Sequence, residues 1–236
     1  MRPWLARLPA AGWPTLDALN ALADEAQVRT ASGKPLRFVP PSAADPYYEI
    51  HLHETGCVAT RERNWHDLFN ALAWLAFPRT KAMINALHAR EIPREGGRRG
   101  RLRDMLTIFD EGGAIVRCDD PELLRLIAEF RWKELFWEQR GRLLAGLRLT
   151  VIGHAVLERA LDPWPGIACK AVFIGFDDDA DATAAERLAK YETPQDLAPL
   201  PVFGYPGWLP ASAHADFYAD ERYFRPLRKS APMSRT

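Results

Sequence analysis

The chain is poor in cysteine and contains no closely spaced cysteine pair. Its 236 residues include three cysteines, Cys57, Cys118 and Cys169, and no CxxC motif. An odd number of dispersed cysteines argues against a disulfide framework and against a structural zinc site. Free thiols persist in a reducing compartment, so we expect a cytoplasmic protein.

An excess of charge of either sign is also missing. The 31 lysines and arginines balance the 31 aspartates and glutamates, which removes any general attraction to nucleic acid or to a membrane surface. The longest apolar run covers residues 68–77 and includes Asn70, whereas a bilayer-spanning helix needs about 20 apolar residues. We therefore expect a soluble protein with no membrane partner, and the overall charge does not favour a nucleic-acid partner.

Several catalytic motifs are absent. There is no GxSxG sequence, and the five serines fall in predicted loops or in the tail, which argues against a serine hydrolase. Neither a Walker A sequence nor an HExxH sequence occurs, so neither a P-loop nucleotide site nor a zincin site is indicated. The sequence identifies no cofactor and no metal site.

What the chain does contain is a mixture of helical and strand patterns. The order of these patterns is irregular and does not repeat a β–α–β unit. It predicts an α+β fold, with helices packed around short antiparallel hairpins and a small mixed sheet. Predicted helices cover residues 15–28, 64–77, 79–90, 121–140 and 154–161, and predicted strands cover residues 47–53, 57–60, 105–109, 114–118, 147–152 and 168–174.

Prolines and aromatic residues concentrate beyond residue 193. A flexible linker would not carry so many large apolar side chains, so we expect residues 193–228 to form an extended tail packed on the body. We expect a single globular domain over residues 1–228 and a disordered C-terminus over residues 229–236.

The predicted helix at residues 64–77 is covered on two faces. An apolar stripe runs along one side. The opposite face lacks the lysine, arginine and glutamate residues that a solvated surface usually carries. Such a helix either lies deep in a core or lines a site. The residues of this second face are His66, Asp67, Asn70, Trp74 and Phe77.

One interpretation makes this face the pocket of a cytosolic enzyme that acts on a small anionic substrate. An imidazole beside a carboxylate and an amide is suited to general acid–base catalysis, with His66 transferring the proton. Basic residues follow the helix directly, and they would hold the anion. The predicted catalytic residues are His66, Asp67, Asn70 and His154, and the predicted substrate-binding residues are Arg79, Lys81 and Trp74.

A structural interpretation of the same residues remains open. Asn64 is a favoured N-cap residue, and Asp67 stands three positions later, as in a capping box. His66 and Asn70 would then only satisfy buried backbone groups.

A second functional interpretation is a non-catalytic binding or adaptor protein. Residues 61–103 hold ten basic and four acidic residues, and residues 177–196 hold seven acidic and two basic residues. The basic stretch at residues 79–103 or the aromatic tail would bind a protein or nucleic-acid partner. The two charged segments could equally face each other or be solvated. No RNA-binding motif accompanies the basic stretch, so nucleic acid is the weaker candidate.

Two other groups of residues admit a metal site. Asp110 and Glu111 are adjacent, and His154 and Glu158 stand four residues apart in a predicted helix. A hairpin turn explains the first pair and a contact between neighbouring helical turns explains the second. We favour these structural explanations.

Five segments of the chain form a recognisable pattern. They are NWHDLFNALAWLAFPRTK at 64–81, RDMLTIFDEGGAIV at 103–116, GHAVLE at 153–158, GYPGW at 204–208 and FYADERYFRP at 217–226. Together they resemble the bacterial family catalogued as domain of unknown function 3025, over residues 45–228. The family name asserts no activity, so the resemblance implies a soluble bacterial protein and no particular reaction or ligand.

Overall fold

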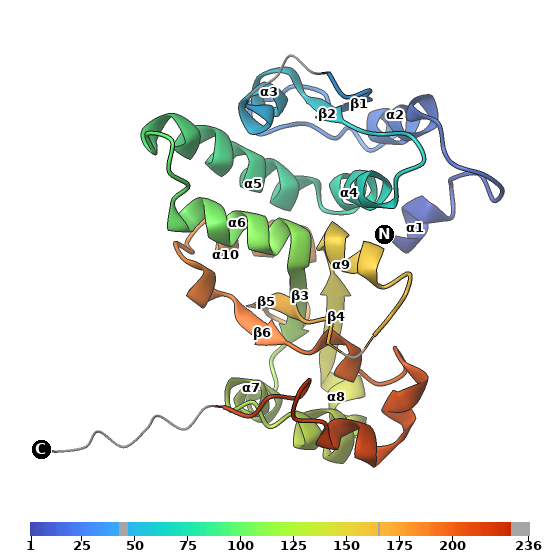
Figure 1. Cartoon of the computed structure of the whole chain (residues 1–236), viewed down its shortest axis with the longest axis vertical. Coiled ribbons are helices and arrows are strands. Elements are labelled where there is room, and N and C mark those ends of the chain that lie inside the picture. Colours follow the sequence, from blue (N-terminus) through green and yellow to red (C-terminus); the bar gives the residue numbers. More distant parts are fainter. Residues whose placement is uncertain (43–46, 165, 228–236) are drawn as a thin grey trace, which may run out of the picture.

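Helices surround two small β-sheets in this protein (Figure 1). The computed structural model describes residues 1–42, 47–164 and 166–227 of the chain. Within these residues the α+β class predicted from the sequence is confirmed. The predicted disorder of residues 229–236 concerns residues outside the described part.

The larger sheet is mixed and has the strand order β4-β3-β5-β6. β3 runs parallel to β5 and antiparallel to β4, and β6 pairs antiparallel with β5. The smaller sheet is the parallel pair of β1 and β2. The strands are β1 (Arg37–Val39), β2 (Cys57–Ala59), β3 (Gly113–Cys118), β4 (Leu147–Val151), β5 (Cys169–Ile174) and β6 (Ala198–Leu200).

In Figure 1, α2 to α5 lie above the larger sheet, and α7 and α8 lie at its lower end. The α-helices are α1 (Arg2–Leu5), α2 (Leu16–Glu25), α3 (Tyr48–Thr55), α4 (Trp65–Ala76), α5 (Pro78–Glu91), α6 (Arg101–Gly112), α7 (Pro121–Ala128), α8 (Arg140–Gly146), α9 (His154–Arg159) and α10 (Ala180–Leu188). A π-helix spans Glu134–Glu138. One-turn 3-10 helices cover Ile92–Arg94, Pro194–Asp196, Val202–Gly204, Pro210–Ala213 and Ala215–Ala219.

Helices α4 and α5 meet at Pro78, where the sequence predicts a break. Phe77 ends α4, and Pro78 occupies the first position of α5, where its missing N–H costs no hydrogen bond. The side chain of Asn64 caps α4 by accepting a hydrogen bond from the backbone N–H of Asp67 at 3.0 Å. The Asn64 cap predicted from the sequence is therefore present.

Two predicted strands are wrong, because both segments are helical. Residues 47–53 belong mostly to α3, which packs against α5 and is joined to it by the Asn85 side chain. Residues 105–109 belong to α6, where Met105, Leu106 and Phe109 form one fully buried helical face. In such short apolar segments, packing against neighbouring helices overrides the local β preference. The predicted hairpin at Asp110 therefore does not exist.

The predicted helix at residues 121–140 is interrupted. Its first part is α7, and Phe130 then adopts a left-handed conformation with φ of 58°. This turn lets Trp132 enter the core, where its indole N–H donates a 2.9 Å hydrogen bond to the carbonyl oxygen of Arg225. The chain resumes as the π-helix and α8.

Most aromatic residues beyond residue 193 pack on the body, as the sequence predicts, whereas Trp208 is exposed. Tyr218, Tyr223 and Phe224 are buried with α7, the π-helix and the larger sheet. The two tyrosine hydroxyl groups form hydrogen bonds: Tyr223 donates to the carbonyl oxygen of Ile167 at 2.7 Å, and Tyr218 donates to the carbonyl oxygen of Gly204 at 3.1 Å. In the described part of the chain, the helices are all too short or too polar to cross a bilayer.

Candidate functional site

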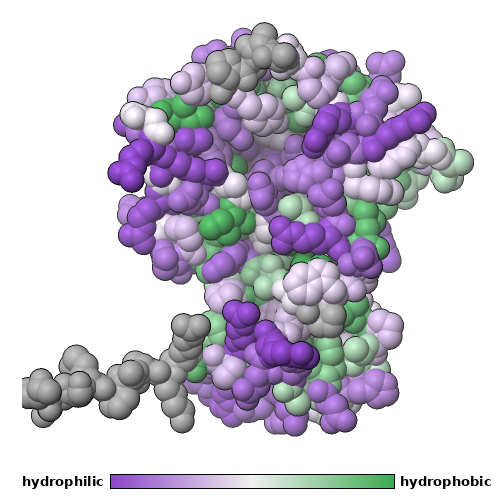
Figure 2. Space-filling view, in the orientation of Figure 1, coloured by the Kyte–Doolittle hydropathy of each residue, from purple (hydrophilic) through white to green (hydrophobic). Residues whose placement is uncertain are grey.

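A polar cavity of about 260 Å³ lies among α3, α4, α5, α6 and α9. Figure 2 shows hydrophilic side chains around a recess in the upper half of this face. The cavity walls carry two basic residues, four carboxylates and three histidines. A cavity with this many ionisable groups differs from an ordinary packing defect, which is apolar and dry.

A buried ion pair lies at the centre of the cavity. The ammonium of Lys81 donates hydrogen bonds to Asp110 and, at 2.8 Å, to the side-chain oxygen of Asn70. Lys81 is 4% exposed and also lies over the ring of Trp74, at 5.6 Å from the ring centroid. Burial opposes ionisation of Asp110, but the charge and the hydrogen bond of Lys81, together with the neighbouring histidines, outweigh burial and lower the pKa of that carboxyl.

Two imidazole rings meet at the edge of the cavity. The rings of His66 on α4 and His154 on α9 are 4.4 Å apart between centroids and nearly perpendicular. Nδ1 of His66 lies 3.0 Å from Oε2 of Glu158, one helical turn beyond His154. A carboxylate in this position holds an imidazole in one orientation.

His154 has a different environment from His66. It is 5% exposed, and burial lowers its pKa to about 4, although the nearby carboxylate of Asp110 opposes this shift. Its Nδ1 lies 3.8 Å from Oδ2 of Asp110 and has no hydrogen-bond partner. His154 is therefore neutral near pH 7, and one of its ring nitrogens is unsatisfied. Native proteins rarely leave a buried polar atom in this state outside functional sites.

The opposite wall contains a second unsatisfied group. The amide nitrogen of Asn85 donates to the carbonyl oxygen of Glu49 at 2.9 Å and to its carboxylate at 2.7 Å. Asn85 is 2% exposed, and its side-chain oxygen has no partner. Burial raises the pKa of Glu49, although the Asn85 hydrogen bond opposes this shift.

The predicted catalytic and binding residues largely come together in this cavity. Its lining includes His66, Asp67, Asn70, Trp74, Lys81 and His154. Arg79 does not line it; its backbone N–H donates a 2.9 Å hydrogen bond to Asp181 instead, and its side chain borders a different hollow. Six of the seven predicted residues thus share one site, and the seventh is elsewhere.

Asp67 has a partner that the capping box does not predict. Its carboxylate accepts hydrogen bonds from the backbone N–H of Arg61 at 2.7 Å and from the Arg61 guanidinium at 2.8 and 2.9 Å. Burial opposes its ionisation, but these bonds outweigh burial and lower the pKa of Asp67. Asp67 therefore holds the loop before α4 beside the cavity.

The sequence interpretation missed several polar residues of the cavity. Asp110 was assigned to a hairpin turn, because residues 105–109 resemble a strand. Lys81, Asn85 and His88 recur at helical spacing along α5, and this polar stripe in an alanine-containing helix is a signal that the sequence offers. No comparable pattern points to Glu49, because the alternation of residues 47–53 predicts a strand.

The two pairs of residues that could admit a metal do not come together as ligand sets. Glu158 bonds to His66, whereas His154 lies beside Asp110. In residues 1–42, 47–164 and 166–227, no three His, Cys, Asp or Glu side chains are placed to hold a metal ion. The candidate site is therefore described by its acid–base groups.

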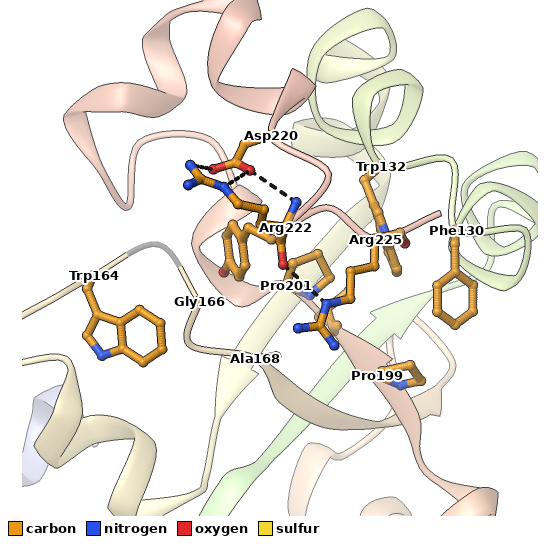
Figure 3. A pocket seen from close by; sticks show the side chains of 12 residues that line it. Phe130, Trp132, Trp164, Gly166, Ala168, Pro199, Pro201, Asp220, Arg222 and Arg225 are labelled. Atoms are coloured by element: carbon orange, nitrogen blue, oxygen red, sulfur yellow. Dashed lines mark hydrogen bonds and ion pairs between the residues drawn. The ribbon is translucent and has the colours of Figure 1, made fainter. Parts of the chain in front are cut away.

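A larger and more apolar cavity of about 670 Å³ lies at the other end of the molecule (Figure 3). Trp164 and Phe130 lie on opposite sides of it, with Arg225 between them. Its carboxylate, Asp220, is already bound by Arg222 at 2.9 Å. This cavity has room for a ligand but few groups that could do chemistry, so we place the candidate site in the polar cavity.

Fold and site together define an α+β protein with an ionisable, partly enclosed cavity between helices. The chain belongs to the family described as a protein of unknown function (DUF3025), whose model matches residues 36–228. No curated protein and no solved structure matches the chain.

Proposed function

We propose that this protein is an enzyme that transfers protons on a small substrate bound in the polar cavity. The observation that carries the proposal is the contact between His66 and His154, two imidazoles in contrasting environments. His66 is oriented by a carboxylate and is about one-third exposed. His154 is buried and neutral. Pairs of titratable groups with contrasting environments are typical of acid–base sites.

The two rings would perform different steps. His66, held by Glu158, is suited to take a proton from the substrate and to return it later. Neutral His154 is suited to donate a hydrogen bond to an oxygen that gains negative charge as the proton leaves. The ion pair of Asp110 and Lys81 beside His154 would place one negative and one positive charge at fixed positions near its ring.

The size of the cavity limits the substrate. A volume of about 260 Å³ lies slightly below the usual range for drug-sized ligands, so the substrate is a small molecule and not a polymer. The predicted anionic character of the substrate stays a prediction. The two basic residues that line the cavity, Arg61 and Lys81, are each paired with a carboxylate.

The adaptor interpretation has less support. In the basic stretch, Arg94 pairs with Glu91, and Arg99 pairs with Asp104. These carboxylates occupy arginine side chains that a polyanionic partner would otherwise bind. Most aromatic tail residues are buried or half-buried, although Trp208 is exposed, so the tail presents little aromatic surface to a partner.

The test is a comparison of turnover between wild-type protein and a His66→Asn variant. Each protein is incubated in deuterated buffer with the small-molecule fraction of a cell extract, and mass spectrometry follows the species that change or gain deuterium. Loss of a general base lowers rates by about 10²–10⁴-fold, so His66→Asn should abolish the change within the time of the assay.

His214→Asn is the matched control, because His214 is an exposed histidine outside the cavity. It should behave as wild type. If His66→Asn and wild type produce the same changes, or if wild type changes no species, the proposed function is wrong.

A further inference from the structure

We infer that the ligand of the polar cavity carries a protonated amine, which binds between the carboxylate of Glu49 and the side-chain oxygen of Asn85. The inference rests on the proposed function only in placing the ligand in the same cavity. It concerns what the cavity binds, whereas the proposed function concerns what His66 does.

The charges of the cavity walls favour a cationic group. Arg61 is matched by Asp67, and Lys81 is matched by Asp110. Glu49, a further carboxylate that lines the cavity, is half-buried and forms no ion pair among the described residues. Withdrawing a carboxylate from water without a cation is costly, and a ligand ammonium would offset this cost.

The orientation of the Asn85 amide adds a directional argument. Both bonds from its nitrogen go to oxygen atoms of Glu49, at 2.9 and 2.7 Å, so a flipped amide would place oxygen against oxygen. Its own oxygen must therefore point away from Glu49, where it lacks a donor. An ammonium has three N–H donors and can serve this oxygen and the Glu49 carboxylate together.

Glu49 lies where a ligand can reach it. Tyr48 and Glu49 line the polar cavity and also a neighbouring hollow of about 350 Å³, so the Glu49 side chain stands between the two spaces. Tyr48 is 37% exposed and forms part of the rim. A small shift of these two side chains would admit a ligand to the Asn85 oxygen.

An anion would be bound poorly at this end. Burial raises the pKa of Glu49, and the negative charge of Asp110 adds to this effect. A ligand carboxylate would be repelled by the same negative charge. It would also face acceptor atoms at positions where it needs hydrogen-bond donors. A ligand ammonium is attracted by this negative charge, and its N–H donors match the acceptor atoms.

The experiment measures binding of matched small probes by isothermal titration calorimetry at constant ionic strength. Ethanolamine and 1,4-diaminobutane are the amines, and glycolate and succinate are the corresponding anions. Wild-type protein should bind at least one amine in a saturable manner and neither anion. Glu49→Gln keeps an acceptor for Asn85 but removes the charge, and it should weaken amine binding by about tenfold or more.

Glu54→Gln is the matched control, because Glu54 is an exposed carboxylate on the same helix. It should bind the amine as wild type does. Tighter binding of an anion, equal amine binding by Glu49→Gln and wild type, or no saturable amine binding would each overturn the inference.

Failure of this inference is distinguishable from failure of the proposed function. His66→Asn should retain amine binding within about twofold, because His66 belongs to the opposite side of the cavity. If amines bind through Glu49 while His66→Asn keeps full turnover, only the proposed function is wrong. If turnover requires His66 but no amine binds through Glu49, only this inference is wrong.

Discussion

At the scale of single residues, the cavity contains pairs of ionisable side chains that differ in charge or in burial. Lys81 and Asp110 form a buried ion pair in which each partner offsets the desolvation of the other. His66 and His154 touch, yet one is held by a carboxylate and the other is buried and neutral. Such differences arise from burial and neighbours, not from residue type.

The low pKa of His154 predicts a dependence of stability on pH. Burial lowers the pKa of His154 to about 4, and it lowers that of His88 to a similar value. Between about pH 6.5 and pH 4 the unfolded chain therefore binds more protons than the folded chain, so stability falls as pH falls. A shift of this size corresponds to about 3 kcal/mol per histidine.

The measurement is the titration of histidine ring signals by nuclear magnetic resonance. The His154 and His88 signals should stay unchanged from pH 7.5 to pH 5, because burial lowers the pKa of both rings to about 4. A His154 signal that titrates near pH 6.5 would contradict the prediction. Chemical denaturation at pH 7 and pH 5 should show lower stability at pH 5, with a smaller difference in a His154→Asn variant.

At the scale of elements, capping positions the helices that form the cavity. Asn64 caps α4 locally, whereas Asp181 of α10 caps α5 from a distant part of the chain. The Asp181 carboxylate accepts hydrogen bonds from the backbone N–H groups of Arg79 and Thr80, at 2.9 and 2.8 Å. A negative charge at this end also favours the helix dipole.

Removal of the distant cap should loosen α5. Asp181→Ala leaves two N–H groups without an acceptor, and we expect a loss of about 1–2 kcal/mol in the free energy of unfolding. Asp181→Asn keeps one acceptor oxygen and should lose less. Urea denaturation measures both variants. Equal stability of Asp181→Ala and wild type would show that the cap is not needed.

At the scale of the whole molecule, the C-terminal tail completes the core below the larger sheet. Phe224 is 4% exposed and packs with Phe136, Phe217 and Tyr218. These contacts join the tail to the π-helix, which lies far from it in the sequence. The tail is therefore part of the core and not an accessory segment.

Truncation of a tail aromatic should therefore destabilise the whole fold. Phe224→Ala removes a buried ring, and such changes cost about 3–5 kcal/mol. Leu227→Ala is the control, because Leu227 is 57% exposed, and it should be nearly neutral. Thermal unfolding followed by circular dichroism measures both. A Phe224→Ala variant with the wild-type midpoint would mean that the tail packs only loosely.

Local patterns in the sequence predicted part of the site as well as part of the fold. The face of α4 without long charged side chains pointed to His66, Asp67, Asn70 and Trp74, which all line the cavity. Local patterns do not predict what covers that face. It is covered by α5, α6 and α9, whereas the tail packs with α7, the π-helix and the larger sheet.

The sequence by itself determined the features that depend on near neighbours in the chain: the Asn64 cap, the break at Pro78 and the strands β3, β4 and β5 of the larger sheet. Only the tertiary structure decided that residues 47–53 and 105–109 are helical. It alone brought Asp110 to Lys81, Glu158 to His66 and Glu49 to Asn85. The physical reason is that these contacts join distant segments, and the free energy of packing them exceeds the small local preferences that sequence patterns report.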